Sequence, residues 1–167
     1  MAQHSQRQGP AWRRLAAACL AACAVSATPA LAADGPQISQ VERSYEDVRF
    51  DLENAIINRG LVIDHISNVG DMLARTAADV GSETQVFVNA EALLFCSARL
   101  SRAAMEAAPE NVAFCPYSVF LYETPDAPGK VSVGYRPLPE QGSEASRAAI
   151  AEVNALLAGI VEEAGGE

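Results

Sequence analysis

Two short apolar segments on either side of a turn constrain the fold of this chain more than any other feature. Residues 118–123 and 130–136 have the composition of strands, and Val131, Val133 and Tyr135 alternate onto one face of the second segment. The residues between them include two prolines, an aspartate and a glycine, which favour turns. The pattern predicts a β-hairpin and therefore an antiparallel sheet.

Helical segments accompany the hairpin. Ser44, Ser97 and Ser143 each stand where an N-cap would open a helix. The last helix has the clearest stripe of apolar residues at helical spacing: Val153, Leu156, Leu157, Ile160, Val161 and Ala164. We expect an α+β fold, a compact two-layer sandwich with helices on one face of an antiparallel sheet and an extra C-terminal amphipathic helix. A doubly wound parallel sheet is not favoured.

The first 32 residues have the layout of a secretory signal peptide. Arg13 and Arg14 precede an apolar run from Leu15 to Ala27, and Ala30-Leu31-Ala32 supplies the small residues that a signal peptidase recognises. The apolar run is too short to cross a bilayer, so no transmembrane span is expected. We expect cleavage near Ala32 and a periplasmic or secreted protein.

Two other kinds of leader share parts of this pattern. The Arg13-Arg14 pair resembles a twin-arginine signal, although the flanking residues fit it poorly, and the export route stays open. Leu20-Ala21-Ala22-Cys23 resembles a lipobox, in which Cys23 would carry a lipid and anchor a lipoprotein. Cleavage after Ala32 is the favoured alternative.

Charge limits the partners that the protein can have. Three of the 12 basic residues and none of the 21 acidic residues lie in the leader, so the remaining chain has 9 basic and 21 acidic residues and a formal charge of −12. A field of this sign repels phosphate backbones, and nucleic-acid binding is not expected. The remaining chain of about 135 residues suits one domain.

An ordered series of short patterns resembles the domain of unknown function 302 family. The patterns are Ser44-Tyr45-Glu46-Asp47-Val48, Gly60, Ile63-Asp64-His65, Phe95-Cys96-Ser97-Ala98, Pro109-Glu110 and the run from Phe114 to Glu123. The resemblance covers residues 38–136. Together with the leader and the last helical stripe, it divides the chain into a signal peptide (1–32), a short tail (33–37), the family domain (38–136), a linker (137–142) and a C-terminal helix (143–167).

The family resemblance implies a structure but no reaction. It implies a compact α+β sandwich with an antiparallel sheet, often dimeric, so we expect a homodimer. At one position the chain departs from the family. Many relatives have a cysteine directly after the proline that Pro116 matches, whereas here Tyr117 follows the proline and Cys115 precedes it. A role tied to the usual order therefore does not transfer to Cys115.

Cleavage after Ala32 leaves two cysteines, Cys96 and Cys115. In an oxidising compartment a nearby thiol pair forms a disulfide by default, and closing a loop of about 20 residues stabilises the fold by about 3 kcal/mol. Two buried thiols, a reversible redox pair and thiolate ligands are the alternatives. Cys96 is the better candidate for a reactive sulfur, because a helix N-terminus after it lowers the thiol pKa.

His65 is the only histidine after the leader, and with Asp64 and Tyr117 it forms the set of candidate ligand-binding residues. As a metal ligand His65 would need sulfur partners such as Cys96 or Cys115, or the methionines Met72 and Met105. That donor set suits copper or haem iron. A histidine beside an acid is more often simply hydrogen-bonded, so no cofactor is predicted. Both methionines lie on apolar helical stripes, and we expect them in the core.

Motifs of the common hydrolases and nucleotide-binding enzymes are missing from the sequence. We therefore assign no catalytic residue and favour a non-enzymatic, exported binding or accessory module. Its partner would be a small ligand or a periplasmic protein of electron transfer or sulfur metabolism. The alternative is a thiol-redox or metal- or haem-binding protein that uses Cys96, Cys115 and His65.

Overall fold

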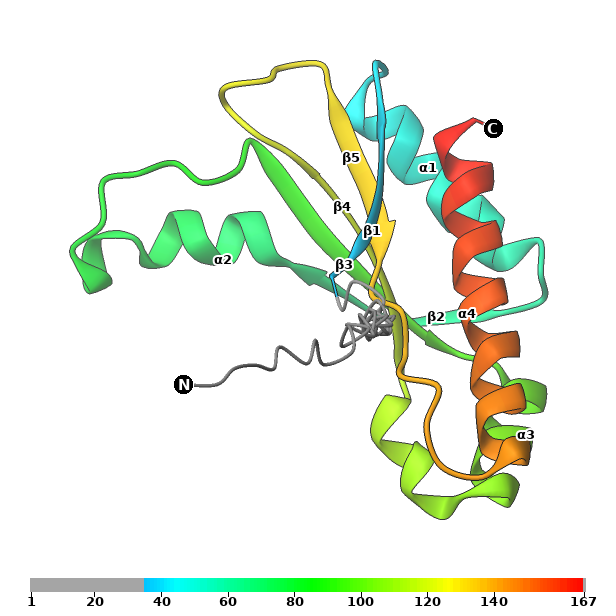
Figure 1. Cartoon of the computed structure of the whole chain (residues 1–167). Helices are drawn as coiled ribbons and strands as arrows, with labels where there is room; N and C mark the ends of the chain where they lie inside the picture. The colour runs from blue at the N-terminus through cyan, green and yellow to red at the C-terminus, as the bar shows by residue number, and fades with distance from the viewer. Residues whose placement is uncertain (1–34, 167) are drawn as a thin grey trace, which may run out of the picture. The chain divides into compact units, whose positions relative to one another are not determined.

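The predicted hairpin lies at the centre of a five-stranded sheet (Figure 1). In the computed structural model, which describes residues 35–166, β4 (Tyr117–Glu123) pairs antiparallel with β5 (Val131–Tyr135). The sheet order is β1-β5-β4-β3-β2, and all neighbours are antiparallel. The other strands are β1 (Gln37–Val41), β2 (Val62–Asn68) and β3 (Asn89–Cys96).

The expected leader, including Cys23 and the cleavage site at Ala32, lies outside the described residues.

The helices begin at the serines that the sequence marks. Ser44 caps α1 (Tyr45–Ile57), Ser97 caps α3 (Ala98–Ala107) and Ser143 caps α4 (Glu144–Gly165), and each hydroxyl accepts a backbone N–H three residues on. The hydroxyl satisfies one of the N–H groups that a helix start leaves unpaired. The remaining helical segments are α2 (Val69–Thr76) and the 3-10 turns η1 (Ala78–Val80) and η2 (Pro109–Phe114). No helix within residues 35–166 is long and apolar enough to cross a membrane.

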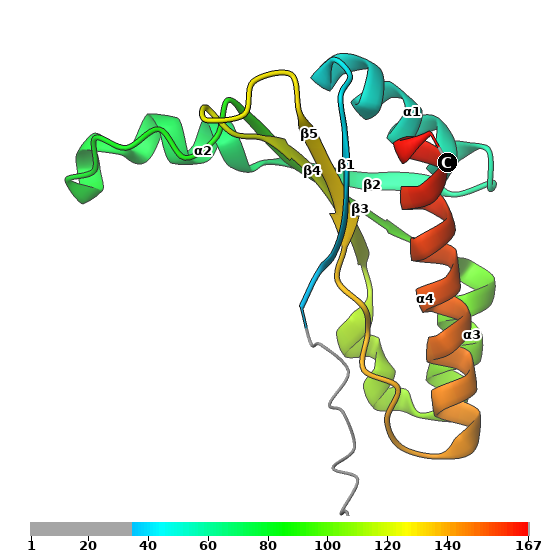
Figure 2. The same ribbon diagram turned by 45° about the horizontal axis from the view of Figure 1, so that its top comes forward.

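The core lies between one face of the sheet and the helices. Alternate strand residues point into it: Leu93 and Phe95 on β3, and Val119 and Leu121 on β4, are almost completely buried. Helices α1 and α4 contact each other and the sheet, and α3 packs against α4 (Figures 1 and 2). The α+β class and the antiparallel sheet are confirmed.

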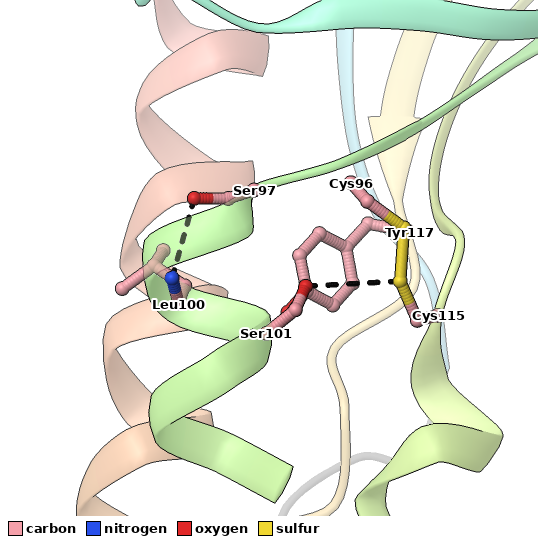
Figure 3. Close-up of a disulfide and its surroundings, with 6 residues drawn as sticks. All are labelled: Cys96, Ser97, Leu100, Ser101, Cys115 and Tyr117. Atoms are coloured by element: carbon pink, nitrogen blue, oxygen red, sulfur yellow. Dashed lines mark hydrogen bonds between the residues drawn. A yellow bond between two sulfur atoms is a disulfide. The ribbon is translucent and has the colours of Figure 1, made fainter.

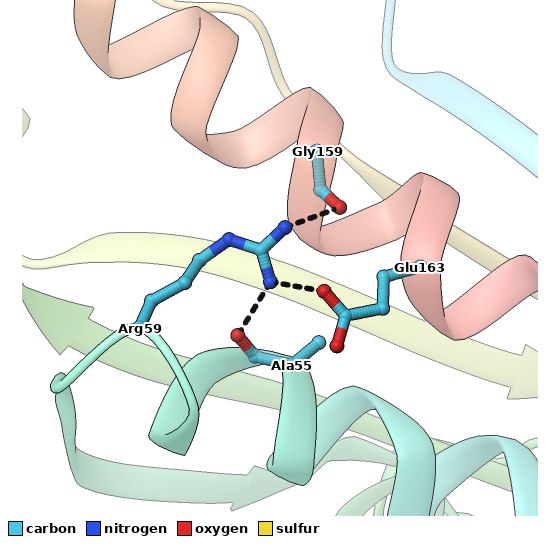
Figure 4. A network of polar contacts seen from close by, with 4 residues as sticks. All are labelled: Ala55, Arg59, Gly159 and Glu163. Carbon is cyan, nitrogen blue, oxygen red and sulfur yellow. Dashed lines mark hydrogen bonds and ion pairs between the residues drawn. The ribbon is translucent and has the colours of Figure 1, made fainter.

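Arg59 joins the end of α1 to α4 (Figure 4). Its guanidinium donates to the carbonyls of Ala55 at 2.7 Å and Gly159 at 2.9 Å, and it pairs with the Glu163 carboxylate at 2.5 Å. The side chain is only 30% exposed, and a planar fork with several donors holds such a site better than a single charge would. Arg59 thus fixes α4 over α1 and over the covered face of the sheet.

Helix α2 leaves the sheet on the side away from α1 and α4 (Figures 1 and 2). None of its residues is buried: Met72 and Leu73 are 39% and 36% exposed, and Val80 of the following η1 is 75% exposed. The expectation that Met72 lies in the core is wrong, because helical spacing shows that an apolar face exists but not what covers it. Met105 of α3 is only partly buried, so it is not a core residue either.

Candidate functional site

Cys96 and Cys115 form a disulfide with their Cα atoms 6.3 Å apart (Figure 3). It links the last residue of β3 to the first residue after η2, and the two cysteines are 19 positions apart in the sequence. The bond therefore ties the segment containing α3 and η2 to the edge of the core.

Polar side chains surround this disulfide. Ser97, beside Cys96, caps α3 by accepting from the Leu100 N–H at 3.4 Å. One turn further on, Ser101 Oγ lies 2.9 Å from Tyr117 Oη and 3.7 Å from Cys115 Sγ (Figure 3). Tyr117 is 3% exposed and its ring packs edge-on against Phe95. The Tyr117 hydroxyl is thus committed to an internal contact with Ser101.

Asp64 and His65 lie on β2, where the pairing with β3 shifts by one residue at a bulge. Both side chains are exposed. His65 is opposite Leu94 in the register, so it shares the uncovered sheet face with Cys96 and is diagonal to it. Such diagonal positions are about 7–8 Å apart. Within residues 35–166, no cluster of three or more His, Cys, Asp or Glu side chains is placed to hold a metal ion.

The uncovered face of the sheet carries an aromatic cluster that sequence analysis missed. Phe120 and Tyr122 of β4 stack with ring centres 6.3 Å apart, and Phe87 lies 5.5 Å from Tyr122. The three rings border an aromatic hollow of about 170 Å³ with mainly apolar walls, whose other residues are Val69, Ala90, Glu91, Ala92 and Leu121. The sequence did contain a signal for this cluster. Successive residues in the middle of β4 are all apolar, so both faces of the strand carry apolar side chains, which indicates a second apolar surface.

Gly134 of β5 lets the Phe120 ring lie flat on the sheet. It is opposite Phe120 in the register, and a side chain at this position would run into the Phe120 ring and the backbone of Gln37. The missing side chain of a glycine is therefore required here for a close approach. Gly134 thus helps to position the Phe120 ring, which forms one wall of the aromatic hollow.

A larger recess of about 490 Å³ lies along α3, where Ala98, Arg102, Met105 and Glu106 line it. All four residues belong to one helix, so the recess is an open surface that encloses nothing. Ligand sites are usually concave and bordered by several elements. The aromatic hollow, which β3, β4, α2 and the following loop border, meets that description better despite its smaller volume.

Comparison with known proteins places the chain in a family. The model of the domain of unknown function DUF302 matches residues 38–164, from β1 through most of α4. The chain belongs to the DUF302 family. A search of the curated proteins finds no match. The homodimer implied by the family resemblance stays a prediction, which light scattering by the purified protein tests.

A solved DUF302 structure has the same fold. The crystal structure of an uncharacterized conserved DUF302 protein from Bacillus stearothermophilus matches with a TM-score of 0.63 and 13% sequence identity. The match covers 77% of this chain and 97% of that chain. At this identity the likeness establishes the fold, and the assignment of a site depends on the residues of this chain alone.

Replacing both Cys96 and Cys115 with serine should lower the free energy of unfolding by about 3 kcal/mol, because the loop of 19 positions is no longer closed in the unfolded chain. Urea unfolding of the oxidised protein and of the double variant measures the difference. Adding a reductant should destabilise the parent protein to a similar extent and leave the variant unchanged. Equal stabilities of the oxidised parent and the variant would contradict a stabilising disulfide.

Proposed function

We propose that this DUF302 protein is an exported, non-enzymatic binding module that holds a small apolar or aromatic ligand in the aromatic hollow. The observation that carries the proposal is the cluster of Phe87, Phe120 and Tyr122 on the sheet face that the core helices α1 and α4 leave uncovered. Contiguous apolar surface of this kind commonly marks an interaction site in a soluble domain.

The geometry of the hollow favours a small ligand over a protein partner. Its volume of about 170 Å³ is below the roughly 300–1,000 Å³ of sites for drug-sized molecules, so it suits a single ring or a short apolar group. A protein of electron transfer or sulfur metabolism would need a much larger contact area. Phe120 and Tyr122 come from the central strand of the sheet, and a rigid strand holds their rings in place before a ligand arrives.

The chemistry of the hollow also limits the ligand. Aromatic rings prefer the offset or edge-on contacts that another flat ring can make. Glu91 in the wall and the formal charge of −12 on the chain after residue 32 disfavour an anionic ligand. A neutral or cationic aromatic compound is therefore the best match.

Replacing Phe120 with alanine should weaken the binding of a neutral compound with one aromatic ring about tenfold, because the substitution removes one ring contact and its buried area. Calorimetric titration of each purified variant with benzyl alcohol measures the dissociation constant. Phe50→Ala is the matched control, since Phe50 is 63% exposed on α1 and lies outside the hollow. Equal losses in both variants, or no loss in Phe120→Ala, would contradict the proposed site.

The export part of the proposal follows from the leader sequence alone. The intact mass of the protein recovered from the producing cell should correspond to a chain that begins at Ala33. A chain that still contains Met1 in the recovered protein would contradict export by this signal. A mass that begins at a lipid-modified Cys23 would instead indicate a membrane-anchored lipoprotein.

A thiol-redox or metal-binding role is the second candidate, since Cys96 and His65 share the uncovered sheet face. In this role two electrons and two protons from a thiol buffer convert the disulfide into two thiols, and the buffer thiols become a disulfide. The reduced protein would then bind copper(I) or haem, and His65→Gln would weaken this binding about tenfold or more. A bridge that glutathione buffers do not reduce, together with no uptake of copper or haem, would eliminate this role.

A further inference from the structure

Tyr45, the first residue of α1, has a buried hydroxyl that makes no hydrogen bond. The residue is 7% exposed, and among the described residues Tyr45 Oη is the one buried side-chain oxygen or nitrogen without a hydrogen-bond partner. Buried polar atoms are nearly always paired, because losing water without a replacement costs roughly 1–3 kcal/mol. An unpaired buried hydroxyl therefore calls for a partner from outside the chain, which a water molecule or a ligand can supply.

Tyr45 borders a polar cavity of about 80 Å³. The other residues of its wall come from the end of β2, the start of α2 and the start of β3: Asn68, Asp71, Asn89, Ala90 and Glu91. A water molecule needs roughly 10–15 Å³ of accessible space, so the cavity accommodates a group of several heavy atoms. It shares only Ala90 and Glu91 with the aromatic hollow, and Tyr45, Asn68, Asp71 and Asn89 belong to the polar cavity alone.

The charges around this polar cavity favour a cation. Arg49 is bound to Glu91 at 2.5 Å and to Glu53 at 3.0 Å, so one positive charge is already shared by two carboxylates. Asp71 adds a third carboxylate in the first turn of α2. The surroundings thus carry an excess of negative charge.

The Tyr45 hydroxyl itself stays neutral. Burial, followed by the nearby negative charge of Glu91, raises the pKa of Tyr45 above its ordinary value. A neutral phenol is a weak ligand for a hard metal ion, but its oxygen accepts a hydrogen bond from an N–H donor. Calcium also needs six to eight oxygen ligands, whereas this wall offers two carboxylates, one of them held by Arg49.

We propose that the polar cavity binds a primary ammonium group, which donates its hydrogen bonds to Tyr45 Oη, the Asp71 carboxylate and the Asn89 side-chain carbonyl. An ammonium has three N–H donors and no acceptor, and these three oxygens can take one donor each. The source of the group is a free alkylamine or a lysine side chain. This site goes beyond the proposed aromatic-ligand function and depends on different residues.

Calorimetric titration of the purified protein with ethylammonium chloride and with Nα-acetyl-lysine amide tests the proposal. Tyr45→Phe and Asp71→Asn should each weaken binding about tenfold or more, because each removes an acceptor of a charged donor. Asp79→Asn is the matched control, since it removes the same charge from η1, outside the cavity. Tyr45→Phe should leave thermal stability equal or higher, because the lost hydroxyl has no partner in the protein.

The two probes identify the source of the ammonium group. Tighter binding of ethylammonium supports a free amine, and tighter binding of the lysine derivative supports a peptide side chain. The proposal is overturned if neither probe binds, if binding persists in both cavity variants, or if calcium binds at this cavity and the ammonium probes do not.

Discussion

The burial of only one face of the sheet is the constraint on which the rest of this structure depends. Helices α1 and α4 cover that face, Arg59 fixes them to each other, and the Cys96–Cys115 disulfide ties the α3 segment to the edge of the same core. Leu93, Phe95, Val119 and Leu121 supply the strand side of this core and are at most 1% exposed. The opposite face has no layer of core helices over it, an arrangement that antiparallel sheets allow.

The two proposed sites follow from where α2 leaves the sheet. Because α2 departs directly after β2 and away from the core helices, it leaves the start of β3 accessible from two directions. The aromatic hollow with Phe120 and Tyr122 lies on one side, and the polar cavity with Tyr45 and Asp71 contains the start of α2. The close approach of Gly70 to Ala90, where a side chain would meet the backbone, fixes this junction.

Local features of the sequence predicted most of the fold, and features that depend on tertiary contacts were missed. The hairpin and the caps at Ser44, Ser97 and Ser143 were predicted because turn chemistry and N-cap bonds act over a few residues. Met72 was wrongly predicted to be a core residue, because an apolar stripe on a helix does not show whether another part of the protein packs against it. The roles of Phe120 and Tyr45 could not be predicted, since one depends on an uncovered sheet face and the other on a missing hydrogen-bond partner. The Cys96–Cys115 pair followed from the expected compartment rather than from spacing.

Hydroxyl-radical footprinting of the free protein tests the one-sided burial most directly. Mass spectrometry of the labelled peptides compares aromatic residues of the same strands on the two faces of the sheet. The structure predicts that Phe120 and Tyr122, which are partly exposed, are oxidised faster than Phe95 and Tyr117, which at 0% and 3% exposure stay protected until the protein unfolds. Equal protection of all four residues would show that both faces are covered and would contradict the central claim.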